Sequence, residues 1–243
     1  SGKATDSFLK AANQGNHEAQ LNLALIYYNG EYEKKDIHKA VDYLQLAAKR
    51  NSDAQNYLAQ LYYNGEGLSQ DIDQSIYYFT LAEKQNNKYA QYNLGMIYIT
   101  EKYSNQYKNK GIDLLIRSSY NGHTEASFVV GFLYQEGKFI KQDVIESINY
   151  YKNASSINNN YAKNNFGVIL KNGVEGIIQQ NIEYARELFI EAIRHKKDSV
   201  SMYNLAHLYI FNEQMKCKID DAIDLLINSS IQKFSPANDL LII

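Results

Sequence analysis

The chain repeats one pattern of apolar and polar positions along almost its whole length. A small residue is followed four positions later by a large apolar residue, then by a second small residue, and three positions further by what is usually tyrosine. Apolar residues at i, i+4, i+7 and i+8 share one face of an α-helix, so each copy predicts an amphipathic helix. The copies open at Ala19, Ala54, Ala90, Ala126, Ala162, Ser201 and Ala237, at intervals of 35 to 39 residues.

A second helix is expected in each repeat. Asp or Asn residues that can cap free backbone N–H groups stand where it would begin: Asp36, Asp71, Asp143 and Asn181. Each second helix carries two small residues seven positions apart, which is two helical turns, so both lie on one face and allow a neighbouring helix to approach closely. We expect these residues to be core: Ala40/Ala47, Ser75/Ala82, Gly111/Ser118, Ser147/Ala154, Ala185/Ala192 and Ala222/Ser229.

A fixed period in this range is typical of a solenoid of stacked helical hairpins. We expect a single solenoid over residues 1–243. It comprises a half repeat at 4–16, repeats at about 17–51, 52–87, 88–122, 123–159, 160–198 and 199–234, and a half repeat at 235–243. The last residues, Leu240 to Ile243, are all apolar, whereas solenoids usually finish in a polar capping repeat. The expectation is therefore a segment of a longer array or protein.

The second unit carries the fullest form of the motif: Ala54, Leu58-Ala59, Tyr62, Gly65-Glu66-Gly67, Asp71, Ser75, Tyr78 and Leu81-Ala82. This pattern resembles the Sel1-like repeat, and the resemblance covers all six complete units and both half units. The related tetratricopeptide repeat usually has a shorter turn and a 34-residue period. The third and sixth units lack the Gly-x-Gly turn, and the fifth is about three residues longer than the others.

The resemblance implies an all-α fold, a right-handed α/α superhelix of helix-turn-helix repeats. It also implies a non-catalytic scaffold or adaptor that binds a segment of a partner protein on its concave groove. An alternative is a regulatory or substrate-docking region of a larger enzyme, for example a kinase or a ubiquitin-ligase complex. A third possibility is a homo-oligomer that pairs through the exposed repeat ends.

The composition of the chain limits the classes of partner that we expect. The formal net charge is −2 and charged residues make up 21% of the chain, so no basic surface is expected to attract nucleic acid. No apolar run approaches the roughly 20 residues that cross a bilayer, so we expect no membrane insertion. With a single cysteine, Cys217, and no signal segment in this sequence, the cytoplasm is favoured.

Residues that could carry chemistry are scattered. No two histidines have the i, i+4 spacing of a helical zinc site, and no Cys-x-x-Cys is present. Cys217 has no recognisable base beside it, and Gly65-Glu66-Gly67 follows a helix and not a strand, which is typical of a turn. The histidines are His17, His38, His123, His195 and His207. We therefore expect no catalysis, no cofactor and no metal.

By analogy with tetratricopeptide repeats, the residues two and six positions after each opening residue face the groove. These are Leu21 and Leu25, Asn56 and Gln60, Tyr92 and Met96, Phe128 and Phe132, Asn164 and Val168, and Tyr203 and His207. Nine positions after the opening residue come Tyr28, Tyr63, Ile99, Gln135, Lys171 and Ile210. The residues at two and six lie four apart and so share one side of the helix.

The third and fourth units place aromatic residues and methionine together at these positions, a composition common in peptide-binding surfaces. The hypothesis is that this patch anchors an apolar segment of a partner, while asparagine and glutamine bond its backbone. The competing interpretation is that the aromatic residues simply pack against neighbouring helices. The candidate partner-binding residues are Asn56, Gln60, Tyr63, Asn64, Tyr92, Met96, Ile99, Phe128, Phe132 and Gln135.

Overall fold

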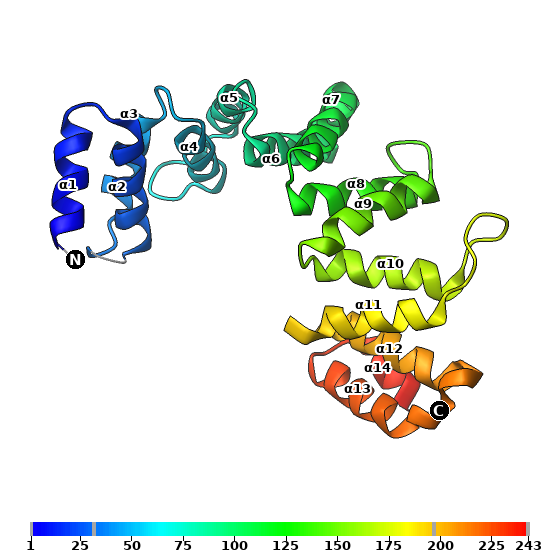
Figure 1. Cartoon of the computed structure of the whole chain (residues 1–243). Helices are drawn as coiled ribbons and strands as arrows, with labels where there is room; N and C mark the ends of the chain where they lie inside the picture. Colours follow the sequence, from blue (N-terminus) through cyan, green and yellow to red (C-terminus); the bar gives the residue numbers. More distant parts are fainter. Residues whose placement is uncertain (1, 31–32, 196–197, 242–243) are drawn as a thin grey trace. The chain divides into compact units, whose positions relative to one another are not determined.

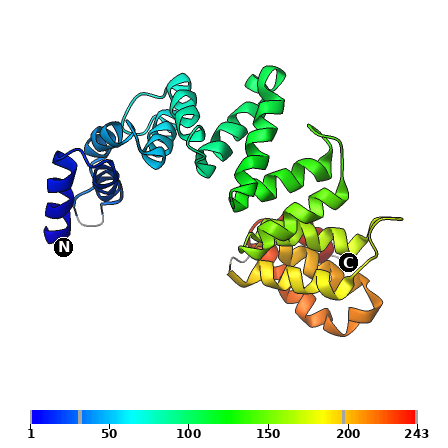
Figure 2. The ribbon, with the colours of Figure 1, turned by 45° about the horizontal axis from the view of Figure 1, so that its top comes forward.

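The computed structural model describes residues 2–30, 33–195 and 198–241. Within these ranges the regular structure is helical, apart from one isolated bridge between Val174 and Ile178. The protein forms two compact units, Ser1–His123 and Thr124–Ile243. Within each unit, helices that follow one another in sequence pack together in pairs (Figures 1 and 2).

The first unit contains one unpaired helix followed by three helical hairpins. Its helices are α1 (Gly2–Asn13), α2 (His17–Asn29), α3 (Ile37–Ala47), α4 (Ser52–Asn64), α5 (Ile72–Glu83), α6 (Lys88–Ile99) and α7 (Glu101–Tyr120).

The second unit contains three hairpins and a short final helix. Its helices are α8 (Thr124–Glu136), α9 (Val144–Ser156), α10 (Asn160–Asn172), α11 (Ile182–His195), α12 (Ser199–Phe211), the 3₁₀ helix η1 (Glu213–Lys218), α13 (Ile219–Ile231) and α14 (Ser235–Leu241). The expected all-α fold of helix-turn-helix repeats is confirmed.

Local sequence sets the helix ends. The Asp71 carboxylate accepts a hydrogen bond from the backbone N–H of Gln74 at 2.9 Å, which caps α5 as expected. Asp36, Asp143 and Asn181 cap their helices in the same way. Gly65 follows α4 with a left-handed φ of 70°, and its N–H donates to the carbonyl of Leu61, so the helix stops there.

The core of each hairpin is made of the residues that the repeat pattern selects. The two small residues of every second helix are buried, as expected. In the six complete repeats the large apolar residue four positions after the opening residue is also buried, with Leu23, Leu58 and Val130 fully covered. Small side chains bring the two helices close together, and the large apolar residue fills the space between them.

The recurring tyrosine stacks on the second helix of its own repeat. Tyr27 lies parallel to Tyr43 with ring centroids 5.8 Å apart, and Tyr62 lies parallel to Tyr78 at 5.7 Å. Tyr134 and Tyr150 repeat the arrangement at 5.7 Å. Stacked pairs of this kind stabilise a fold by about 0.5–1.5 kcal/mol beyond the area they bury.

The three units that depart from the motif do so in their connections. In the third, Thr100 alone separates α6 from α7, which therefore begins at Glu101 and runs for 20 residues. In the sixth, η1 replaces the glycine turn. In the fifth, the extra residues form the loop between α10 and α11 (Figure 1), closed by reciprocal hydrogen bonds of 2.8 Å between Val174 and Ile178.

Two expectations concern residues that are only partly described. Ile242 and Ile243 of the apolar end lie outside the described residues, whereas Leu240 is partly buried against the core of the second unit. The backbone of Cys217 belongs to η1, and its side chain lies outside the described part of the structure.

Candidate functional site

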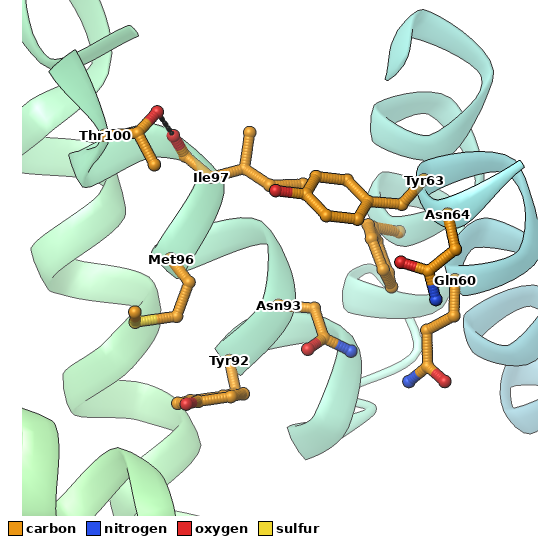
Figure 3. A pocket seen from close by; sticks show the side chains of 9 residues that line it. Gln60, Tyr63, Asn64, Tyr92, Asn93, Met96, Ile97 and Thr100 are labelled. Atoms are coloured by element: carbon orange, nitrogen blue, oxygen red, sulfur yellow. Dashed lines mark hydrogen bonds between the residues drawn. The ribbon is translucent and has the colours of Figure 1, made fainter. Parts of the chain in front are cut away.

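The first unit contains a pocket of about 440 Å³ between two neighbouring first helices, α4 and α6 (Figure 3). We call it the α4–α6 pocket, and its lining residues are Gln60, Tyr63, Asn64, Phe79, Tyr92, Asn93, Met96, Ile97 and Thr100. Five of these residues, Gln60, Tyr63, Asn64, Tyr92 and Met96, are among the candidate binding residues. The structure therefore brings these five candidates to one site.

The pocket is lined by both apolar and polar side chains. Tyr63 reaches across from α4 and is 42% exposed, while Met96 and Tyr92 project from α6 (Figure 3). Gln60 and Asn64 stand beside them on α4. Within the described residues, no hydrogen bond engages either side-chain amide, so both can bond a ligand.

The ring of Tyr92 is held in place by His123. The two rings stack with centroids 4.6 Å apart and an angle of 15° between their planes. Tyr89 meets the same imidazole edge-on at 5.2 Å. His123 is thus a buried support for one wall of the pocket.

Asn56 has a different environment from the one proposed for it. It is only 5% exposed, and its Oδ1 accepts a hydrogen bond of 3.1 Å from Nδ2 of Asn93 on the next first helix. The same contact recurs in the second unit, where Asn164 Oδ1 accepts from Asn204 Nδ2 at 2.8 Å. We therefore infer that Asn56 ties adjacent repeats together and lies beneath the binding surface.

Asn56→Ala is expected to lower the free energy of unfolding by about 1–2 kcal/mol, because the amide of Asn93 loses its buried acceptor. Gln60→Ala, on the same helix but without such a bond, should change it by less than about 0.5 kcal/mol. Urea unfolding of both variants, with an Asn56/Asn93 double-mutant cycle, measures the difference. Equal stability of the two single variants would contradict the tie between repeats.

Two further candidates are engaged in internal contacts. Ile99 packs beside Gly111 of α7, where a Cβ on the glycine would lie 3.0 Å from Ile99 Cγ2. Gln135 Oε1 accepts a 2.8 Å hydrogen bond from the hydroxyl of Tyr151, and burial raises the pKa of that phenol to about 12. Neither residue lines the α4–α6 pocket.

The remaining candidates, Phe128 and Phe132, belong to α8 in the second unit. Phe128 is half-buried and lies 6.1 Å from the ring of Tyr151 and 5.9 Å from that of Tyr161, so much of its surface is packed. Phe132 is exposed. The hypothesis that Phe128 and Phe132 share one partner-binding patch with Tyr92 and Met96 of α6 stays a prediction.

Four lining residues of the α4–α6 pocket were absent from the candidate set: Phe79, Asn93, Ile97 and Thr100. Ile97, seven positions after Ala90, belongs to the apolar stripe of the repeat pattern. Phe79 comes from the second helix α5, Asn93 stands one position after the expected groove residue Tyr92, and Thr100 lies beyond the end of α6. Asn93 and Thr100 are three and ten positions after Ala90. The analogy with tetratricopeptide repeats selects positions two, six and nine after the opening residue, so it misses both. Considering every position of the first helix and its C-terminal end would have included them.

An equivalent place in the second unit holds a smaller pocket of about 180 Å³, which we call the α10–α12 pocket. Its lining residues are Lys171, Asn172, Gln180, Ile182, His207, Leu208, Phe211 and Asn212. Burial lowers the pKa of Lys171 below its usual value. Burial, followed by the nearby charge of Lys171, lowers the pKa of His207.

Among the described side chains, no three His, Cys, Asp or Glu residues gather closely enough to hold a metal ion. None of the helices, over their described residues, is long and apolar enough to cross a membrane.

Comparison with protein families matches the Sel1 repeat at residues 17–52, 52–87, 88–123, 124–159 and 160–196. The chain belongs to the Sel1 repeat family. This confirms the resemblance seen in the motif. Sel1 repeat solenoids generally act as scaffolds for protein–protein interaction and are typically non-enzymatic. No curated protein matches this Sel1 repeat protein.

Solved structures share the fold. The Sel1 repeat protein is similar to a protective antigen of uropathogenic Escherichia coli with an SLR fold, at 24% identity and a TM-score of 0.85. The match covers 98% of this chain and 51% of the antigen, so the chain spans about half of that protein's length. A Sel1 repeat protein of Oxalobacter formigenes matches at 23% identity and a TM-score of 0.78, covering 94% of this chain and 99% of the other.

Proposed function

We propose that the protein is a non-catalytic adaptor that binds a segment of a partner protein at the α4–α6 pocket. The observation that carries this proposal is an apolar-lined pocket of about 440 Å³ beside two amides that no described group engages. Sel1 repeat proteins typically bind protein partners, which supports the choice of ligand class.

In this proposal an apolar side chain of the partner enters between Tyr63, Tyr92 and Met96. Aromatic residues and methionine are enriched at the centres of protein interfaces, where they bury large areas and adapt to the partner's shape. Because Tyr92 is stacked on His123, its ring is already ordered, so binding costs little side-chain entropy.

Gln60 and Asn64 would bond the backbone of the bound segment. Each amide offers both a donor and an acceptor, which suits the alternating N–H and C=O groups of an extended peptide. Asn56, the candidate expected to share this role, is engaged with Asn93 instead.

The test is a selection of displayed peptides on the full-length protein, followed by affinity measurements on the selected peptides. We expect them to share a large apolar residue. The double variant Tyr63→Ala/Met96→Ala should weaken their binding by about tenfold or more, since central aromatic anchors contribute about 2 kcal/mol or more.

The control is Tyr77→Ala, which removes an exposed tyrosine of α5 that does not line the pocket and is 54% exposed. It should bind the peptides as the parent does, and thermal unfolding should show that both variants are folded. Failure to select any peptide, or equal binding by the double variant, would overturn the proposal.

A further inference from the structure

The α10–α12 pocket occupies the same place in the repeat as the α4–α6 pocket but has different chemistry. Counted from the opening residues, Lys171 stands where the first unit has Tyr63, and His207 stands where it has Met96. Phe211 corresponds to Thr100 in the same way. Three uncharged residues of the first pocket are thus replaced by a lysine, a histidine and a phenylalanine in the second.

The ammonium of Lys171 has no counter-ion among the described residues. Two acidic side chains of the adjacent helix α11 are paired elsewhere: Glu183 bonds Arg186 at 3.0 Å, and Glu191 bonds Lys163 at 3.0 Å. Helix α12 contains no acidic residue. A partly buried, unpaired cation is costly, and an anion supplied from outside would remove that cost.

We propose that the α10–α12 pocket binds one carboxylate of a partner protein, with Lys171 as its counter-ion. Phe211, which is 52% exposed, would contact the apolar part of the same residue or its neighbour. The amide of Asn172 lies in the same lining and can donate to the second carboxylate oxygen.

The charge of the pocket favours a carboxylate over a phosphate group. Lys171 is the one lysine or arginine in its described lining. Burial and the charge of Lys171 lower the pKa of His207, which favours the neutral form of that imidazole. A phosphate group carries nearly two negative charges and is usually met by several arginines. A single carboxylate, whether from an acidic residue or from the C-terminus of the partner, matches one lysine.

The experiment follows the imidazole resonances of His207 in the full-length protein by NMR, with His207→Gln used to assign them. Three capped dipeptides serve as probes: acetyl-Leu-Glu-amide, acetyl-Leu-Gln-amide, and acetyl-Gly-Leu with a free C-terminus. We expect saturable shifts and a raised His207 pKa with a carboxylate probe, and no saturation with the glutamine probe. The first and third probes distinguish a glutamate carboxylate from a C-terminal carboxylate.

Lys171→Met should weaken binding of the carboxylate probe by about tenfold or more, whereas Lys171→Arg should retain most of it. Lys152→Met is the matched control, because Lys152 is an exposed lysine of the same unit that does not line the pocket. Equal shifts with the glutamine probe, unchanged binding by Lys171→Met, or tighter saturation by inorganic phosphate would each overturn the proposal.

This inference does not depend on the α4–α6 pocket, which lies in the other unit and shares none of its residues. The Tyr63→Ala/Met96→Ala variant should bind the carboxylate probe as the parent does. Failure of one proposal therefore leaves the other standing.

Discussion

Leu94→Ala is expected to lower the free energy of unfolding of the first unit by about 2–5 kcal/mol. Leu94 is 1% exposed and belongs to a core cluster with Ala59, Phe79 and Leu114, which come from α4, α5 and α7. The alanine variant would lose contacts with all three helices and leave a cavity. In a solenoid each repeat is stabilised mainly by its neighbours, so loss at this junction weakens both adjacent repeats.

Urea unfolding followed by circular dichroism measures this loss, and hydrogen exchange in α6 locates it. Leu46→Ala is the matched control, because Leu46 is 41% exposed on α3 and should cost less than about 1 kcal/mol. If Leu94→Ala unfolded at the same urea concentration as the Leu46 variant, the packing of α6 against these three helices would be wrong.

Gly67→Ala is expected to destabilise the first unit by about 2–5 kcal/mol. Two costs combine: a left-handed φ, here 75°, costs an L-residue about 1–2 kcal/mol, and overpacking costs about 1–3 kcal/mol more. The added Cβ would lie 1.9 Å from Cγ2 of Ile37 on α3 and 3.4 Å from Val41 Cγ2. Because Ile37 belongs to the preceding repeat, the substitution would push adjacent repeats apart.

Gly122→Ala is the control that measures the backbone strain without the overpacking. Gly122 has a similar φ of 79°, but a Cβ there would meet nothing within 4 Å, so only the backbone strain of about 1–2 kcal/mol applies. Adding Ile37→Ala to Gly67→Ala should recover part of the loss, because it removes the clashing methyl group. Equal unfolding free energies for the Gly67 and Gly122 variants would show that the turn does not press on the preceding repeat.

The lining of the proposed binding pocket was only partly predictable from the repeat pattern. Gln60, Tyr63 and Met96 line the α4–α6 pocket, as the offsets along the helix indicated. Asn56 does not, because its side chain bonds Asn93 on the first helix of the next repeat. Its partner Asn93 lies 37 positions away, and nothing in the local pattern of α4 specifies which group will meet it.

The order of the helices, their caps and their buried faces are properties of short stretches of sequence. A capping aspartate and a stripe of apolar residues act within a few turns, so Asp71 and Leu58 could be interpreted without knowing the fold. Whether a groove-facing residue is available to a partner depends on residues of another repeat. The unpaired ammonium of Lys171 is visible only after folding, because the pairing of Glu191 on α11 with Lys163 on α10 is a tertiary outcome.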